Sequence, residues 1–153
     1  MKLFAASTHT ILDGEMDIHR TYMKRLGISL DEAENTPVAL DNRSYTSYML
    51  RAAYEGGEAE VMAAILSCAL SYEAIAKQIV KENPEADKHP FYGEWVSGYA
   101  SESYHEENER LIGMMNRLAA DCTPAQEAHL IDIFTACSRY EAAFWDMAWE
   151  MRR

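Results

Sequence analysis

The chain has 153 residues, and its 25 Asp and Glu against 14 Lys and Arg give a net charge of −11. The length predicts one domain over residues 1–153, since two domains would each be close to the smallest size that holds its own core. The negative charge argues against nucleic acid and anionic membranes as partners, because both would be repelled. Only seven Gly and four Pro interrupt the chain, which favours long helices.

The spacing of apolar residues is helical along nearly the whole chain, and no segment alternates as a strand would. The first helix is expected to end at Gly27, and an acidic linker follows over residues 28–41. Residues 83–90 are expected to form a surface loop, and Thr123-Pro124-Ala125-Gln126 reads as the start of the last helix. The predicted helices cover residues 7–26, 42–55, 58–81, 92–97, 101–120 and 123 to the C-terminus.

The helix at residues 58–81 is apolar nearly all round, which predicts the central, buried helix of an all-α bundle. No apolar run reaches the eighteen residues of a membrane-spanning helix. The first residues lack the apolar stretch and cleavage site of a signal peptide. Three cysteines, an odd number, fit reduced thiols better than disulfides. We therefore expect a cytoplasmic protein.

Glu141 is the most informative single residue. On the last helix it falls in the middle of an apolar stripe that includes Phe134, Cys137, Phe144 and Trp145. A carboxylate that faces a core is costly unless it is paired or hydrogen-bonded. It is therefore either a structural partner of a tyrosine or lysine, or part of a functional site.

Cys68 lies in the middle of the apolar helix, and Tyr72 follows one turn later on the same face. A lone cysteine there is either a small hydrophobic residue or a reactive thiol, which would need a proton acceptor close by. Glu141 could be that acceptor if the two helices face each other. The tyrosines either line the core or form a pocket that stacks a flat heterocycle. Those at buried-looking positions are Tyr45, Tyr48, Tyr72, Tyr99 and Tyr140.

Two carboxylate–histidine spacings could hold a metal. Glu102-x-x-His105 has the spacing that di-iron bundles use, and Glu15 precedes His19 by one turn. A di-iron bundle needs two such elements and two further glutamates, and here there is one. His105 is followed by several glutamates, which predicts a solvated face. We therefore expect no metal site and no other cofactor.

Four segments together resemble the TenA/thiaminase II family, in the family's order and over essentially the whole chain. They are NRSYTSYMLR at residues 42–51, AILSCALSYEAI at 64–75, WVSGYAS at 95–101 and SRYEAAFWDMA at 138–148. The resemblance implies a haem-oxygenase-like helical bundle that binds no haem, and hydrolysis of aminopyrimidines or thiamin in thiamin salvage.

The resemblance also implies roles for single residues. Cys68 matches the family's nucleophile, which adds to the pyrimidine ring so that an amine on the exocyclic methylene can leave. Glu141 matches the acid–base carboxylate that protonates a ring nitrogen. Tyr45 and Tyr99 match tyrosines that orient the ring and the thiol, and Tyr72 is expected to line the same pocket.

Family members have additional helices before the first one expected here, and these helices carry a substrate-binding aspartate. The chain is therefore expected to be a truncated relative, and its uncovered apolar helix predicts a homo-oligomer, a dimer or tetramer, or a separately encoded N-terminal fragment as partner. Two other functions remain open. One is a non-catalytic helical module for assembly or ligand binding, and the other is a metal-dependent oxidase of the related bundle type.

Overall fold

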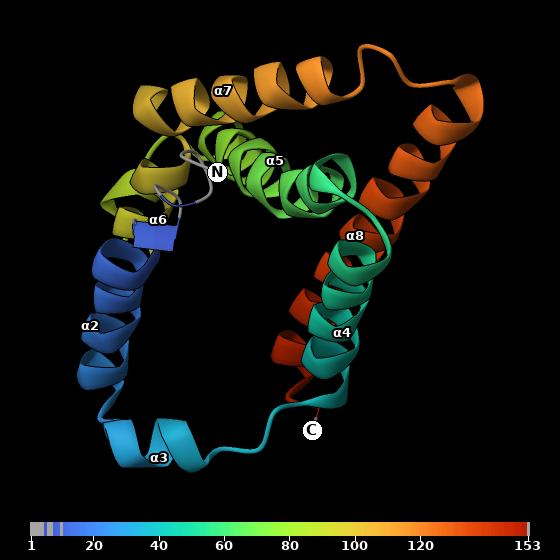
Figure 1. Ribbon diagram of the computed structural model, residues 1–153. Helices are drawn as coiled ribbons and strands as arrows, with labels where there is room; N and C mark the ends of the chain where they lie inside the picture. Colours follow the sequence, from blue (N-terminus) through green and yellow to red (C-terminus); the bar gives the residue numbers. More distant parts are fainter. Residues whose placement is uncertain (1–4, 6–7, 10, 153) are drawn as a thin grey trace. The chain divides into compact units, whose positions relative to one another are not determined.

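The computed structural model describes residues 5, 8–9 and 11–152, and the elements in that part of the chain are all helical (Figure 1). The all-α prediction is therefore confirmed. The elements are η1, a π-helix (Ile11–Glu15), α2 (Met16–Leu26), α3 (Leu30–Asn35), α4 (Leu40–Glu55), α5 (Glu58–Glu82), η2, a 3-10 turn (Ala86–Lys88), α6 (Gly93–Tyr99), α7 (Glu102–Leu118) and α8 (Pro124–Glu150).

The chain divides into two compact units, residues 1–38 and residues 39–153. The first unit holds η1, α2 and α3. Gly27 ends α2 with a φ of 71°, a left-handed conformation that glycine adopts without strain, as the sequence predicted. The predicted start of this helix at Ser7 lies outside the described residues.

The acidic linker expected at residues 28–41 is not without structure, because it contains α3. Ser29 caps this helix by accepting a hydrogen bond from the Glu32 amide, while the Glu32 carboxylate accepts one from the Ser29 amide at 2.9 Å. This capping box is a known start signal, and the sequence reading missed it. Similarly, the loop expected at residues 83–90 contains the turn η2.

The second unit is built around α5, which packs against α4, α6, α7 and α8, while α4 also lies along α8 (Figure 1). The helix starts as the sequence predicts, after Gly56 and Gly57, and the Glu60 carboxylate accepts the Gly57 amide proton at 2.7 Å. The prediction of burial on every side is wrong over its second half, where Ala74, Ile75 and Gln78 are exposed.

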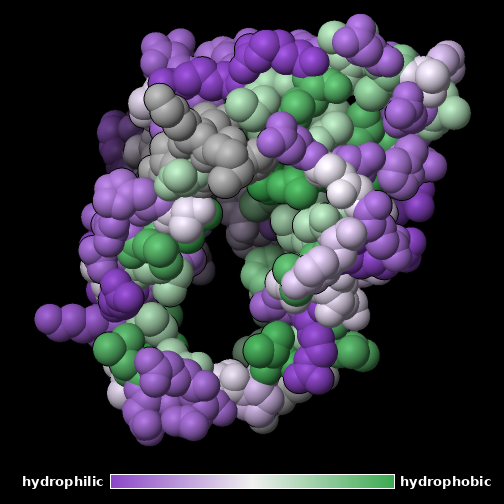
Figure 2. Space-filling view, in the orientation of Figure 1, coloured by the Kyte–Doolittle hydropathy of each residue, from purple (hydrophilic) through white to green (hydrophobic). Residues whose placement is uncertain are grey.

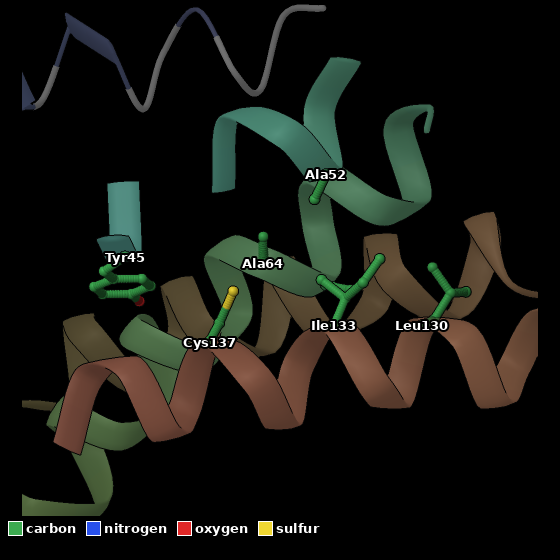
Figure 3. Packing of buried hydrophobic residues seen from close by; sticks show 7 residues of the cluster. Tyr45, Ala52, Ala64, Leu130, Ile133 and Cys137 are labelled. Carbon is green, nitrogen blue, oxygen red and sulfur yellow. The ribbon is translucent and has the colours of Figure 1, made fainter. Parts of the chain in front are cut away.

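A small hydrophobic core joins α4, α5 and α8 (Figure 3). Side chains from the three helices interlock there because small residues of α5, such as Ala63 and Ala64, let the neighbouring helices approach closely. The cluster consists of Tyr45, Ala52, Ala63, Ala64, Leu130, Ile133 and Cys137. It holds in place the three helices that carry the candidate site.

By length and composition alone, α5 could also cross a membrane, which the count of uninterrupted apolar residues did not indicate. The core helix of a helical bundle has the same composition. Here α5 packs against four other helices and carries the buried, hydrogen-bonded carboxylate of Glu73. Its composition is that of a core helix.

Apolar side chains also reach the surface of the second unit, among polar ones (Figure 2). On α4 and α8 these exposed residues are Leu40, Leu50, Tyr54, Ile131, Trp145 and Trp149. Single exposed apolar residues are common in soluble proteins. Because several exposed apolar residues lie on the adjacent helices α4 and α8, the surface of these two helices is a candidate for contact with another chain.

Candidate active site

Glu141 of α8 is buried, with 5% of its surface exposed. Its charge acts on the hydroxyls of Tyr45 from α4 and Tyr72 from α5, so groups from three helices lie within electrostatic reach of one another here. Burial raises the pKa of Tyr45, and the negative charge of Glu141 raises it further, against a hydrogen bond with Ser67. Burial and the Glu141 charge also raise the pKa of Tyr72. Both tyrosines therefore stay protonated and present O–H groups.

Cys68 is half-buried on α5, one turn before Tyr72. A thiolate at Cys68 would raise the pKa of both Tyr45 and Tyr72, so its sulfur lies within electrostatic reach of the same two hydroxyls as Glu141 does. The structure thus brings Cys68, Glu141, Tyr45 and Tyr72 into one region. The sequence spacing had placed only Cys68 and Tyr72 on a common face.

An aromatic cluster adjoins this region. The Tyr72 ring lies 4.8 Å from the ring of Tyr99 and 5.8 Å from those of Trp95 and Trp145, measured between centroids. Trp145 is 40% exposed, so the cluster extends from the buried carboxylate to the surface. We call these four residues, Tyr72, Trp95, Tyr99 and Trp145, the aromatic cluster. Aromatic faces at such spacings suit the stacking of a flat heterocycle.

Sequence reasoning did not place Trp95 and Trp145 in the site. Their helical spacing could have done so, because Trp95 precedes Tyr99 by one turn and Trp145 follows Glu141 by one turn. The position of α6 depends on a close backbone approach. A Cβ at Gly93 would lie 2.2 Å from the Asp87 carbonyl oxygen, so that glycine is required where α6 begins.

Ser67 and Cys137 are two further buried groups beside Glu141 that the sequence did not single out. The Ser67 hydroxyl donates to the Ala64 carbonyl at 3.0 Å and lies 3.5 Å from the Tyr45 hydroxyl. Cys137 is fully buried, and burial raises the pKa of its thiol. Cys137 is therefore expected to be less reactive than Cys68.

A second buried carboxylate, Glu73, joins α5 to α7. It accepts hydrogen bonds from His105 Nδ1 at 2.7 Å, from Asn108 Nδ2 and from Lys77 Nζ. Burial alone would raise the pKa of Glu73, but the hydrogen bonds it accepts outweigh that effect and lower the pKa to about 2. Glu73 is therefore an ionised carboxylate with a structural role.

This arrangement corrects the reading of His105 as part of a solvated face. His105 is half-buried and bonds Glu73, while Glu102 is exposed. In the part of the chain that the structure describes, no three His, Cys, Asp or Glu side chains are grouped to hold a metal ion. Glu15 and His19 form an exposed pair at 3.9 Å.

Comparison with known proteins gives consistent matches. The sequence profile of the TENA/THI-4/PQQC family matches residues 1–151. The chain is 43% identical to an aminopyrimidine aminohydrolase of Halalkalibacterium halodurans, over 99% of this chain and 67% of that protein. It is 38% identical to an aminopyrimidine aminohydrolase of Helicobacter pylori, over 98% of this chain and 69% of that protein.

Among solved structures, a TenA homologue from P. horikoshii OT3 superposes with a TM-score of 0.79 at 30% identity. The match covers 93% of this chain and 64% of that one. The chain thus spans about two thirds of the length of the relatives it matches.

Proposed function

Because the chain belongs to the TENA/THI-4/PQQC family, whose fold is an all-α haem-oxygenase-like bundle, we propose that it hydrolyses an aminopyrimidine. The observation that carries the proposal is the buried Glu141 carboxyl group, which interacts electrostatically with the same two tyrosine hydroxyls as Cys68 does. A thiol, a carboxyl group and an aromatic cluster supply a nucleophile, a proton donor and a stacking surface. The relatives named aminopyrimidine aminohydrolase support this substrate class.

In the proposed reaction the Cys68 sulfur adds to a carbon of the pyrimidine ring, and Glu141 gives a proton to a ring nitrogen. The amine takes up the proton released from the Cys68 thiol, and electrons returning from the ring then expel it from the exocyclic methylene as ammonia. Water adds to that methylene as hydroxide and gives its other proton to the Glu141 carboxylate. The Cys68–ring bond then breaks, and the proton on the ring nitrogen passes to the leaving sulfur, which restores the aromatic ring and the free thiol. The net change replaces the amine by a hydroxyl group and consumes one water, so no redox cofactor is needed.

The tyrosines would orient the reactants. Tyr45 and Tyr72 interact electrostatically with Glu141, and Tyr99 packs against Tyr72, so the acid lies next to the stacking surface. An acid that is held in place gives a larger rate enhancement than a mobile one, because little orientational entropy is lost on reaching the transition state. Thiamin, whose pyrimidine carries the same exocyclic methylene, is the second substrate to test. We place this activity in thiamin salvage in the cytoplasm.

Thiol labelling tests the proposal against a non-catalytic helical module. With one alkylating reagent, Cys68 should be modified first, because Cys137 is fully buried and its thiol pKa is raised. An aminopyrimidine should slow the labelling of Cys68 and leave that of Cys122, a half-buried thiol in the loop between α7 and α8, unchanged. A Cys68 that reacts no faster than Cys137, with or without the pyrimidine, would favour the module.

We further propose that the chain assembles as a two-fold homo-oligomer, a dimer or tetramer. The exposed apolar residues of α4 and α8 are the observation behind this proposal. Isologous contact between copies of one surface is the commonest way in which such residues are covered. A partner chain that covers the same surface would be the alternative outcome.

A further inference from the structure

Tyr104, in the first turn of α7, is held by hydrogen bonds at both of its ends. Its backbone amide donates at 3.2 Å to the hydroxyl of Ser101, the residue that caps α7. Its side-chain hydroxyl reaches across to α5 and donates to the Ala69 carbonyl oxygen, also at 3.2 Å. Ala69 directly follows the proposed nucleophile, Cys68. The phenol ring of Tyr104 therefore lies between the start of α7 and the turn of α5 that carries the thiol.

The Tyr104 ring packs against Tyr99 of the aromatic cluster. The two ring centroids lie 5.0 Å apart and the ring planes meet at 86°, the edge-to-face geometry that aromatic pairs prefer. Tyr99 is the last residue of α6, a helix of only seven residues. Because so short a helix is not stable by its backbone hydrogen bonds alone, side-chain contacts have to hold Tyr99 in place. The same Tyr99 ring contacts Tyr72 at 4.8 Å and Trp95 at 4.9 Å, so its position sets that of the stacking surface.

Asn108 makes a second bond to the same carbonyl and provides a matched comparison. Its side-chain amide donates to the Ala69 carbonyl oxygen at 3.2 Å and also to the Glu73 carboxylate. Asn108 therefore fastens α7 to α5 at the same place as Tyr104 does, but it has no ring to pack against Tyr99. A variant of each residue separates the attachment of the two helices from the support of the Tyr99 ring.

We propose that Tyr104 is a positioning residue which, through the Tyr99 ring, fixes the stacking surface of the aromatic cluster. The proposal rests on the function proposed above, in which this surface holds a pyrimidine. Tyr104 itself does not touch the substrate. Because stacking holds the pyrimidine alike in the bound state and in the transition state, a displaced surface should raise KM more than it lowers kcat.

Steady-state kinetics of the full chain with an aminopyrimidine is the first readout. Tyr104→Leu, which removes the ring and keeps a good helix former, should raise KM about two- to tenfold, the contribution of one aromatic pair. Tyr104→Phe keeps the ring and loses only the bond to Ala69, so its KM should stay close to that of the wild type. Asn108→Ala should leave KM unchanged.

A double-mutant cycle with Tyr99→Leu tests whether Tyr104 acts through Tyr99. In that background Tyr104→Leu should cause no further rise in KM, because the ring that it supports is already absent. The second readout needs no substrate. It is the long-wavelength edge of the near-ultraviolet circular dichroism spectrum, which reports the fixed packing of tryptophan rings and to which tyrosine does not contribute. Tyr104→Leu should weaken this signal as Tyr99→Leu does, and Asn108→Ala should keep it.

The outcomes separate the role of Tyr104 from the proposed function. If the wild type turns over and Tyr104→Leu raises KM no more than Asn108→Ala, or raises it equally in the Tyr99→Leu background, the role of Tyr104 is overturned and the function stands. A Tyr104→Phe variant with a KM as high as that of Tyr104→Leu also overturns it, and this comparison with the wild type holds even if Tyr104→Leu does not fold. If the wild type has no turnover, the function is wrong, and the tryptophan signal decides: a loss in Tyr104→Leu supports the role, and an unchanged signal overturns it.

Discussion

Replacing Glu73 by glutamine should remove most of the acid sensitivity of folding that this residue creates. In the folded chain hydrogen bonds lower the pKa of Glu73 from an ordinary 4.5 to about 2. When folding lowers the pKa of a carboxyl group, that group stabilises the folded protein at every pH above its pKa in the unfolded chain. The stabilisation is lost as the pH falls through the pKa of the group in the folded chain. The relevant window therefore runs from about pH 4.5 down to about pH 2.

The size of the effect follows from the same values. A pKa difference of about 2.5 corresponds to about 3 kcal/mol of unfolding free energy, and Glu73 is buried enough for little of this to be screened by water. At neutral pH the wild type should therefore be more stable than Glu73→Gln by up to about 3 kcal/mol. That difference should close as the pH approaches about 2.

The assay is urea unfolding followed by circular dichroism at several pH values. The control is Glu109→Gln, an exposed carboxylate on α7, which should follow the wild type at every pH. A stability difference between the wild type and Glu73→Gln that stays constant across the acid range would show that Glu73 is not held ionised by His105, Asn108 and Lys77, and would refute the reasoning.

Three further predictions concern catalysis, packing and assembly. Glu141→Gln should lower the hydrolysis rate about 10²- to 10⁴-fold, the usual contribution of a general acid–base group, and unchanged turnover would remove Glu141 from the mechanism. Gly93→Ala should destabilise the chain by about 1–3 kcal/mol, because the added Cβ would clash with the Asp87 carbonyl. Gly98→Ala on the same helix is the control, since its Cβ meets open space and should stabilise the chain slightly. Thermal melts that show no difference between the two variants would contradict this prediction. Sedimentation equilibrium at micromolar concentration should show a species of twice or four times the 17.4 kDa chain mass, and a well-folded monomer would disprove assembly.

The long helices of this chain could be predicted because their apolar period and end signals agree. Thr123 and Gln126 form the expected capping box, and the Gly56-Gly57 pair separates α4 from α5. The expected family membership was also confirmed. Short elements were missed, since α3 depends on a single capping box and buries no residue of its own.

The candidate site was only partly accessible from sequence. The apolar stripe around Glu141 indicated a buried carboxylate, and the structure has it buried. The second buried carboxylate, Glu73, was missed because its partners His105 and Asn108 lie more than thirty residues along the chain. The contact between Ser67 and Tyr45 was missed for the same reason, as the two residues lie on different helices. Sequence periodicity assigns a residue to a face, but it does not identify the helix opposite.

The most direct test of the central claim is the release of ammonia from an aminopyrimidine that carries an aminomethyl group, measured with the wild type and Cys68→Ala in parallel. Cys68→Ala removes only the sulfur from a half-buried position, so the fold should be kept. The account predicts steady turnover by the wild type and none above background by the variant. Equal rates for the two proteins would contradict it, and so would a folded wild type that releases no ammonia.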